Sequence, residues 1–369
     1  MQDNTSLEIL LVTPPGFEEI LRAEVTEKGF KKAKILTGGV LIKGGWPEVY
    51  RANLQLRGAS KVLVRLGSFR AFHLSELDKK ARQFPWNDFL NPRTPIRVDV
   101  STSKSKIYHK KAAVERIERA LEEILHCEAD PEAGLQIKVR LFKDICTISL
   151  DSSGEGLHKR GSKEALNKAP LRETLAALSL RACGFKGKEP VIDPMCGSGT
   201  FILEAAEIAS RLDAGRNRAF AFETLKNFDP KAWKTVKEKS NPCAVEDRFF
   251  GFDRDKGAIS FATANAERAQ VSAITSFTRQ TLSNIQAPKG PAGLMITNPP
   301  YGTRIGDQKK LLPLYQSLGN KFRSDFNGWR LGLITNSDRL AHATGLDFKK
   351  TPIAFSHGGI NVKLYQTEG

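Results

Sequence analysis

The 369-residue sequence predicts an α/β protein in which a doubly wound, Rossmann-like parallel sheet follows two smaller α+β units. From about residue 170 onward, short apolar strands alternate with helices, and repeated βα units of this kind form a parallel sheet with helices on both faces. The strand at 190–193 runs into a turn of small residues and then a helix, which places a ligand site at the carboxyl end of the sheet. Before residue 160 strands and helices do not alternate in this way.

Apolar periodicity predicts the elements of the first part of the chain. Residues 18–28 have helical spacing and stop at Gly29, and residues 33–43 form a hairpin that turns at Gly38 and Gly39. A helix is expected over residues 108–127, where apolar side chains share one face. Strands are expected at 61–66, 96–100, 135–141 and 145–150.

The C-terminal elements follow from the same patterns. A helix over 170–182 begins with a proline near its start and is followed by Gly184. Strands are expected at 190–193, 249–253, 293–297 and 330–335, and helices from 200, over 256–269 and over 311–326. A last hairpin turns at Gly358 and Gly359.

Charge predicts a polyanionic partner. Lys and Arg number 57 against 41 Asp and Glu, a net charge of +16, and residues 1–160 and 161–369 are both basic. Such a surplus favours nucleic acid through neutralisation of phosphates, although solubility alone is the plainer explanation.

Other classes of protein are disfavoured. The five cysteines form no C-x-x-C pair and the six histidines show no metal-ligand spacing, which argues against a zinc knot, a disulfide framework and metal chemistry. No run of 18 apolar residues predicts a membrane span, and no export signal is visible at the start, so a cytoplasmic location is expected.

The turn after strand 190–193 has the features of a ligand cradle. Gly197 and Gly199 allow the backbone to approach a ligand closely, and the helix that follows offers free N–H groups. Asp253 ends the next strand, where a carboxylate can accept hydrogen bonds from both hydroxyls of a ribose. A glycine turn alone is a weak signal, because dinucleotide-binding proteins use similar turns.

Asp-Pro-x-x-Gly-x-Gly at 193–199, together with Asn-Pro-Pro-Tyr at 298–301, resembles the class I S-adenosylmethionine-dependent amino methyltransferases. The resemblance implies methylation of an exocyclic amine, whose lone pair is delocalised into the base. The Asn298 side-chain oxygen and the Pro299 carbonyl would accept the two N–H bonds of that amine. Pro299 and Pro300 would stiffen the motif, and the Tyr301 ring would stack on an extruded base unless it is only a packing aromatic.

The resemblance extends over nearly the whole chain. Residues 60–155, with Gly156–Gly161 and Ala169–Leu175 after them, look like a THUMP domain and its linker into a methyltransferase. The closest family is the bacterial guanine-N2 methyltransferases of 23S ribosomal RNA in their stand-alone form. It implies a ferredoxin-like domain at 1–59, a THUMP domain at 60–155, a linker at 156–169 and a class I methyltransferase domain at 170–369.

The same resemblance implies S-adenosyl-L-methionine as cofactor. Asp193 and the glycine turn would contact its methionine end, and Asp253 its ribose. The family has an Asp near 280, whereas this chain has Gln280, whose amide oxygen could still accept from the adenine amino group. The expected cofactor-binding residues are Glu173, Thr174, Asp193, Pro194, Met195, Cys196, Gly197, Ser198, Gly199, Thr200, Phe201, Asp253, Arg254, Gln280, Thr281 and Asn298.

RNA contacts are expected in two places. One is the lysine cluster Lys104, Lys106, Lys110 and Lys111, for which a solvated helix face is the alternative. The other is His158 and Arg160, which could equally be a plain interdomain linker.

Several activities stay open. The same chemistry on tRNA fits the THUMP resemblance equally well, and N6-adenine methylation of DNA fits Asn-Pro-Pro-Tyr but not the rest of the chain. A non-catalytic RNA-binding factor with a degenerate methyltransferase fold is the fourth alternative. Cysteine nucleophiles have little support, because Cys243 lies before the Asp253 strand and Cys196 lies inside the turn.

Overall fold

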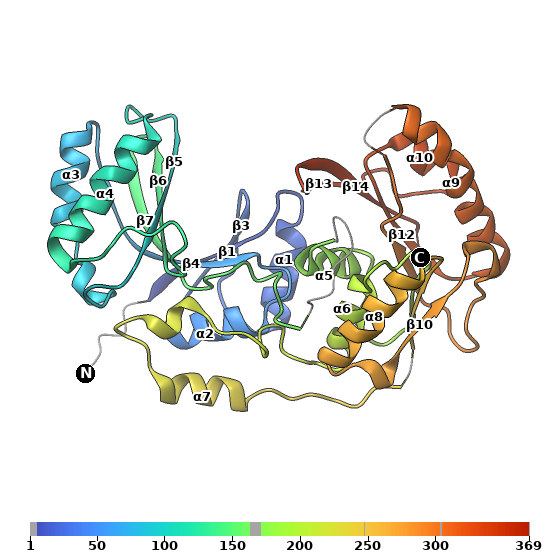
Figure 1. Ribbon diagram of the computed structural model, residues 1–369. Helices are drawn as coiled ribbons and strands as arrows, with labels where there is room; N and C mark the ends of the chain where they lie inside the picture. Colours follow the sequence, from blue (N-terminus) through green and yellow to red (C-terminus); the bar gives the residue numbers. More distant parts are fainter. Residues whose placement is uncertain (1–5, 163–170, 247, 303–304, 369) are drawn as a thin grey trace. The chain divides into compact units, whose positions relative to one another are not determined.

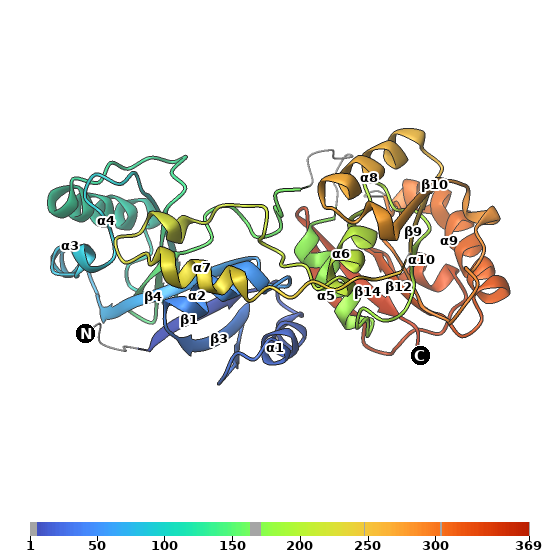
Figure 2. The same ribbon diagram turned by 90° about the horizontal axis from the view of Figure 1, so that it is seen from below.

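The computed structural model describes residues 6–162, 171–246, 248–302 and 305–368, and it divides into two compact units (Figures 1 and 2). Unit 1 combines the chain up to Thr13 with residues 25–157 and 218–239. Unit 2 combines residues 14–24 and 158–217 with the chain from Ser240 onward. Each unit is built on its own seven-stranded sheet.

The sheet of unit 1 has the strand order β2-β3-β1-β4-β7-β6-β5. Neighbouring strands are antiparallel except for the parallel pair β5 and β6. The strands are β1 (Leu7–Val12), β2 (Lys34–Leu36), β3 (Gly39–Gly44), β4 (Lys61–Arg70), β5 (Arg97–Ser103), β6 (Gln136–Phe142) and β7 (Ile145–Asp151).

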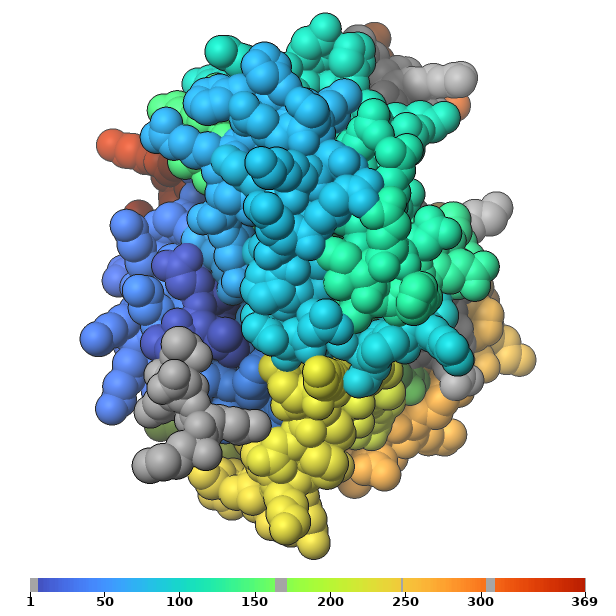
Figure 3. Space-filling view, turned by 90° about the vertical axis from the view of Figure 1, so that its left-hand side faces the viewer, coloured from blue at the N-terminus to red at the C-terminus, as the bar shows by residue number. Residues whose placement is uncertain are grey.

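Strand β4 makes this sheet continuous. Its first half pairs with β1 and residues 63–70 pair with β7, with a bulge between Arg65 and Gly67. The helices of unit 1 are α2 (Trp46–Gln55), α3 (Leu74–Arg82), α4 (Lys110–Leu125) and α7 (Pro230–Glu238), while α1 (Glu18–Glu27) crosses the boundary in sequence between the units. Helices α3 and α4 pack against each other, and α4 packs on β5. The segment that contains them forms the light-blue to teal surface in the upper part of Figure 3.

An aromatic cluster binds residues 218–239 into unit 1. The Tyr50 ring of α2 lies 4.6 Å from the Phe222 ring and 6.0 Å from the Trp233 ring of α7, measured between centroids. Tyr50 is fully buried. The predicted methyltransferase domain at 170–369 includes residues 218–239. Aromatic residues on a short helix do not indicate which hydrophobic core they will join.

Unit 2 contains the predicted doubly wound sheet, with the strand order β10-β9-β8-β11-β12-β14-β13. Strands β8 to β12 are parallel and the last two strands run antiparallel to their neighbours. The strands are β8 (Val191–Asp193), β9 (Phe249–Asp253), β10 (Thr275–Arg279), β11 (Leu294–Thr297), β12 (Arg330–Thr335), β13 (Ile353–His357) and β14 (Ile360–Gln366).

Helices cover both faces of this sheet. Helices α6 (Thr200–Ala209) and α8 (Lys256–Arg268) pack on β8–β10, and α5 (Glu173–Ala182) packs on α6. Helices α9 (Ile305–Asp325) and α10 (Asp338–Ala343) lie on the other side, as Figures 1 and 2 both show. A core that includes Tyr315, Phe326 and Trp329 lies between α9 and the sheet.

The structure confirms the predicted fold class, an α/β methyltransferase-type sheet preceded by α+β elements. The predicted helix at 256–269 is α8 and the predicted helix at 108–127 is α4, within two residues at each end. Helices α2, α3, α7 and α10 were not predicted. The domain boundaries at 59, 155 and 169 stay predictions. No helix of the described chain is long and apolar enough to cross a membrane.

Candidate methyl-transfer site

Three strand ends of unit 2 bring the predicted residues together. In the parallel register, Ile192 of β8 lies between Phe250 of β9 and Met295 of β11, so the residues that follow emerge at one edge. These residues are Asp193, Asp253 and Asn298. The strand order reverses direction between β8 and β11, and this switch point is where open α/β sheets bind ligands.

Asp193 ends β8 and is only 3% exposed. Its Oδ1 accepts a hydrogen bond from the Met195 N–H at 3.1 Å. Burial raises the pKa of this carboxyl to about 7, against the lowering effects of the Met195 amide and the Thr297 hydroxyl, and with a further increase from the charge of Asp253. A buried acid with a perturbed pKa at a strand end is typical of a functional site.

The glycine turn is closed by its own backbone. The Gly199 N–H donates to the Cys196 carbonyl at 2.9 Å, and the Cys196 N–H donates to the Phe252 carbonyl of β9 at 2.8 Å. Gly199 has a φ of +86°, and a Cβ there would lie 3.0 Å from the Phe277 ring, so any larger residue would be strained at this position. Burial raises the pKa of the Cys196 thiol well above its usual range, which suits a lining residue better than a nucleophile.

Asp253 is oriented by two backbone amides. Its Oδ2 accepts from the Gly197 N–H at 3.0 Å, and its Oδ1 accepts from the Asp255 N–H at 3.0 Å. The carboxylate thus joins the end of β9 to the glycine turn of β8. Arg254, next in the chain, is exposed, and its carbonyl accepts from Arg279 Nε at 3.1 Å.

Gln280 lies beside Asp253 at the end of β10. Its N–H donates to the Asp253 carbonyl at 2.9 Å, and its side-chain Nε2 donates to the Asn284 carbonyl at 2.5 Å. With Nε2 engaged, the amide oxygen is the side-chain atom left to accept. Thr281, which follows, has its hydroxyl 3.1 Å from that of Ser283. Recognition of an adenine amino group by Gln280 stays a prediction.

Hydrogen bonds from α9 and from the residue after β12 hold the Asn-Pro-Pro-Tyr segment and the glycine that follows it. The Tyr315 hydroxyl of α9 donates to the Pro300 carbonyl at 3.3 Å, and Asn336 Nδ2 donates to the Gly302 carbonyl at 3.0 Å. The Tyr301 ring is half-buried against the α9 core, and burial raises the pKa of its hydroxyl. Asn298 Oδ1 is buried and has no hydrogen-bond partner among the described residues.

An unpaired buried carbonyl oxygen costs about 1–3 kcal/mol. Native proteins retain such groups mostly where a ligand or water completes them. Asn298 Oδ1 is therefore a buried oxygen of this site that has no partner among the described residues, as is Asn336 Oδ1.

The start of α5 lies against the start of α6. Glu173 is the first residue of α5, and Thr174 after it is buried. Glu173 and Thr200 line the same cavity of about 10 Å³, together with Arg160 and Glu204. This cavity has room for about one water molecule, and cofactor contact by Glu173 and Thr174 stays a prediction.

The structure corrects the expectation that Arg160 contacts RNA. Its side chain is 4% exposed, and its guanidinium pairs with the Glu204 carboxylate of α6, with Nε 2.9 Å from Oε1. A buried guanidinium that is paired in this way has no face to offer a phosphate. This burial favours the linker alternative for Arg160, since a sequence shows a basic residue but not the buried acid that it meets. His158 is partly exposed, and its RNA contact stays a prediction.

The predicted lysine cluster lies in unit 1, around the start of α4. The loop before α4 is held by Asp144, whose carboxylate accepts from the Ser105 hydroxyl at 3.0 Å and the Lys106 N–H at 2.7 Å. The Lys106 amide contact lowers the pKa of the Asp144 carboxyl. Tyr108 is 68% exposed beside this loop. All four lysines of the cluster are exposed, namely Lys104, Lys106, Lys110 and Lys111.

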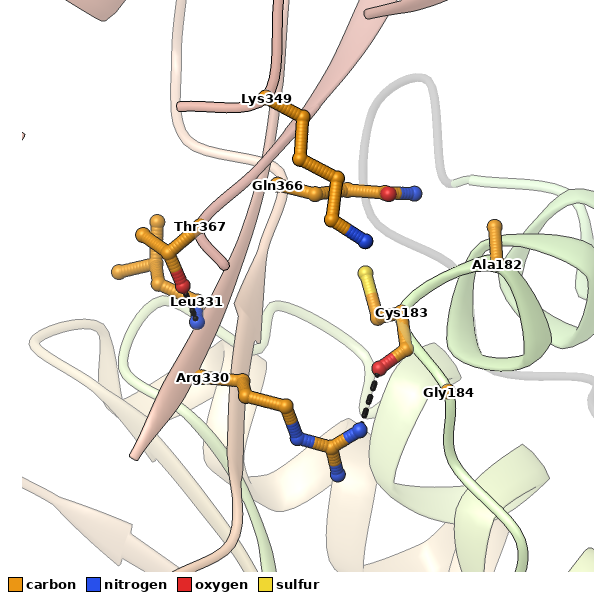
Figure 4. A pocket seen from close by; sticks show the side chains of 8 residues that line it. All are labelled: Ala182, Cys183, Gly184, Arg330, Leu331, Lys349, Gln366 and Thr367. Atoms are coloured by element: carbon orange, nitrogen blue, oxygen red, sulfur yellow. Dashed lines mark hydrogen bonds between the residues drawn. The ribbon is translucent and has the colours of Figure 1, made fainter. Parts of the chain in front are cut away.

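A larger cavity, of about 250 Å³, lies at the opposite edge of the unit 2 sheet (Figure 4). Arg330 at the start of β12 donates to the Cys183 carbonyl at 2.7 Å and so caps the end of α5. Arg330 pairs in register with Leu294, the first residue of β11, so this cavity is at the amino ends of the strands. None of the predicted site residues lines it.

Sequence reasoning missed Asn265, Tyr315 and Asn336, all of which contact the site backbone. Asn265 lies in a helix whose apolar pattern predicts a buried position there, and a buried amide is a recognisable signal. Asn336 follows a strand end and could have been found in the same way as Asn298. Among the described residues, no group of three or more His, Cys, Asp or Glu is arranged to hold a metal ion.

Comparisons with family models, curated proteins and solved structures each find proteins that are similar to this chain. Family models match along its length: an RlmL ferredoxin-like domain at residues 8–63, a THUMP domain at 72–151, and an RMKL-like methyltransferase domain, UPF0020, at 160–363. A protein of Vibrio campbellii named ribosomal RNA large subunit methyltransferase K/L is 32% identical over 348 residues, which are 90% of this chain and 49% of that protein. The chain spans about half the length of the curated relatives it matches.

Solved structures share the fold over the whole length. The crystal structure of SMU.472 complexed with SAH has a TM-score of 0.88 and 25% identity, and covers 100% of this chain and 99% of that one. A Listeria monocytogenes protein described as a predicted N6-adenine-specific DNA methylase has a TM-score of 0.88 and 27% identity, and covers 99% and 97%. With a family model that matches more than half of its residues, the chain belongs to the UPF0020 family of RMKL-like methyltransferase domains.

Proposed function

We propose that this protein transfers the methyl group of S-adenosyl-L-methionine to the exocyclic N2 of a guanine in 23S ribosomal RNA. The observation that carries the proposal is the Asn298 Oδ1 atom, buried and without a partner among the described residues. It lies at the carboxyl end of β11, next to the strand that ends in Asp193.

An exocyclic amine supplies the hydrogen-bond donor that Asn298 Oδ1 lacks among the described residues. The amine of guanine donates two N–H bonds, and the Asn298 oxygen with the Pro299 carbonyl offers two acceptors. When both N–H groups donate hydrogen bonds to these acceptors, the nitrogen lone pair, which is otherwise shared with the ring, becomes localised. It then points away from the two acceptors. The hydrogen bonds from Tyr315 and Asn336 to the backbone of residues 300 and 302 hold this geometry.

The residues of the turn fit the cofactor. Asp193 offers a buried carboxylate to an ammonium group, and Asp253, fixed by two backbone N–H groups, offers acceptors to ribose hydroxyls. The first N–H groups of α6 favour a carboxylate. S-adenosyl-L-methionine would supply an electrophilic methyl group at this edge. The SAH complex of SMU.472 supports this assignment.

RNA is the favoured substrate because of the first half of the chain and the charge of the whole chain. The matches to THUMP and RlmL ferredoxin-like domains, the net charge of +16 and the exposed lysines all point to a polyanion. The curated relatives carry the name of a large-subunit ribosomal RNA methyltransferase, which favours ribosomal RNA over tRNA.

The test is methyl transfer from labelled S-adenosylmethionine to three pools from a strain that lacks this gene: 23S rRNA, tRNA and unmethylated DNA. Nucleoside mass spectrometry identifies the product. N2-methylguanine in 23S rRNA is expected. The same product in tRNA alone, N6-methyladenine in DNA, or no product with intact cofactor binding would each overturn the proposal.

Replacement of Lys110 and Lys111 by Ala should weaken RNA binding in a salt-dependent way. Each lost phosphate contact reduces the magnitude of the log–log salt slope by about 0.7–0.9, so the pair should reduce it by up to about 2. The helix should not suffer, because lysines in a first turn oppose the helix dipole. Lys231→Ala with Lys234→Ala, exposed on α7 of the same unit, is the matched control. An unchanged slope in Lys110→Ala/Lys111→Ala returns these lysines to a solvated face.

Tyr301→Ala should lower kcat/KM for RNA by about 5- to 150-fold, since stacking of a base on an aromatic ring contributes about 1–3 kcal/mol. Tyr301→Phe keeps the ring and should stay within about threefold of wild type. Steady-state kinetics on both variants check this. Equal losses in the two would assign the effect to the hydroxyl and contradict stacking.

A further inference from the structure

Asn265 of α8 reaches the glycine turn from the side. It is fully buried, and its Nδ2 donates to the Ser198 carbonyl at 3.2 Å. The peptide unit between Ser198 and Gly199 is therefore fixed at both ends. Its carbonyl is held by Asn265, and its N–H is held by the Cys196 carbonyl.

This peptide unit needs an external anchor. Gly197 and Gly199 flank Ser198 and have φ values of +53° and +86°. Glycine adopts positive and negative φ about equally readily, so within the turn only the Gly199 N–H to Cys196 carbonyl bond opposes rotation of this peptide. If the peptide between Ser198 and Gly199 rotated, its carbonyl would point where its N–H points now. The start of α6 would then be displaced as well.

The anchor continues to the segment that enters unit 2. Arg268, one turn further along α8, donates from Nη2 to Asn265 Oδ1 at 2.5 Å and from Nε to the Ser162 carbonyl at 3.0 Å. Arg160, two residues before Ser162, donates hydrogen bonds to the Glu204 carboxylate of α6 from Nε at 2.9 Å and from Nη2 at 3.4 Å. Residues 160–162 are thus held by both α6 and α8, the two helices next to the turn.

These contacts form one connected series, from residues 160–162 through Arg268 and Asn265 to the Ser198 carbonyl. Arg160, Glu204 and Asn265 are each at least 96% buried. Buried polar groups in such a series have a low tolerance for alternative arrangements, because any break leaves a group unpaired away from water. In sequence, residues 160–162 begin the methyltransferase match, which starts nine residues after the THUMP match ends at residue 151.

We propose that Asn265 and Arg268 are positioning residues: Asn265 fixes the cofactor-binding turn, and Arg268 couples that turn to residues 160–162, which follow one of the places where the chain passes from unit 1 into unit 2. The inference rests on the proposed function in one respect, that the glycine turn holds S-adenosyl-L-methionine. Neither residue touches the reacting atoms.

Asn265→Asp separates the two contacts of the amide. The variant keeps an oxygen for Arg268, but it loses the donor to Ser198 and places a carboxylate oxygen against that carbonyl. The dissociation constant for S-adenosylmethionine, measured by calorimetry on the full chain, should rise about tenfold or more with unchanged stoichiometry. Glu267→Gln, on an exposed position of the same helix, is the control and should bind normally.

Arg268→Met tests the coupling. It leaves Asn265 to hold Ser198, so the dissociation constant for S-adenosylmethionine should stay within about threefold. Release of Ser162 should instead raise KM for RNA or lower kcat by about fivefold or more. A purely structural role would shift cofactor binding, RNA kinetics and thermal midpoint together in both variants.

Wild-type cofactor affinity in Asn265→Asp would overturn the role of Asn265, and wild-type RNA kinetics in Arg268→Met would overturn the coupling. If Asn265→Asp fails to fold, Asn265→Ser, which is smaller and uncharged, carries the same measurement. Cofactor binding is read without RNA. A wrong substrate assignment would therefore appear as absent transfer by the wild type, and the Asn265 result would still stand.

Discussion

Asn298→Ala should lower kcat for methyl transfer by about 100- to 1,000-fold while it leaves the dissociation constant for S-adenosylmethionine within about twofold. Loss of one preorganised polar group at a reacting centre has effects of this size. The Asn298 oxygen has no partner among the described residues, so its removal breaks no hydrogen bond between this oxygen and those residues. The variant should keep the thermal stability of the wild type or exceed it, because a buried unpaired oxygen is gone.

Single-turnover transfer together with calorimetric titration of the cofactor checks this prediction. Asn320→Ala, an exposed asparagine on α9, is the matched control and should transfer at the wild-type rate. Rapid transfer by Asn298→Ala would mean that another group accepts from the amine. Weak cofactor binding in that variant would mean that Asn298 acts on the cofactor side of the site.

Cofactor affinity should depend on pH through Asp193. Its pKa is raised to about 7 in the cofactor-free protein by burial, and an ammonium group beside it needs the ionised form. The dissociation constant should therefore rise about tenfold for each pH unit below 7 and level off above 7. Calorimetry from pH 5.5 to 7.5 checks this, because above that range the α-amino group of the ligand itself titrates.

Asp193→Asn should remove this dependence and raise the dissociation constant at pH 7.5 by about 10- to 100-fold, the contribution of a hydrogen bond between charged groups. The sign for stability is opposite. The folded pKa lies above the value of 3.8 for an unperturbed Asp, so the cofactor-free wild type loses stability as the pH rises from about 4 to 7. Asp193→Asn should escape that loss, and a flat stability profile for the wild type would contradict the raised pKa.

Strand ends explain why much of the candidate site could be predicted. Buried parallel strands are short apolar runs, and a polar residue directly after such a run lies at the ligand edge of the sheet. Asp193, Asp253 and Asn298 were found in this way. Gln280 was found only because the family resemblance marked the place, since β10 is exposed at its end and carries no apolar run there.

Contacts between distant segments could not be predicted. A basic residue after a strand is as compatible with RNA contact as with a buried acid, and Arg160 was misassigned because Glu204 lies on a helix 44 residues away. The packing of residues 218–239 against Tyr50 is not visible in the sequence for the same reason, since Tyr50 lies far back in the chain. Local patterns determine elements, whereas a shared core depends on which surfaces meet.

The path of residues 218–239 has a consequence for modularity. The chain leaves the methyltransferase unit after α6, contributes Phe222 and Trp233 to the core around Tyr50, and returns to form β9. A cut near residue 157 would leave one fragment with an open aromatic core and the other with a solvent-exposed hydrophobic loop of the kind that promotes aggregation. Such an interlaced arrangement favours inheritance, expression and exchange of the two units as a single piece, even though each has its own sheet.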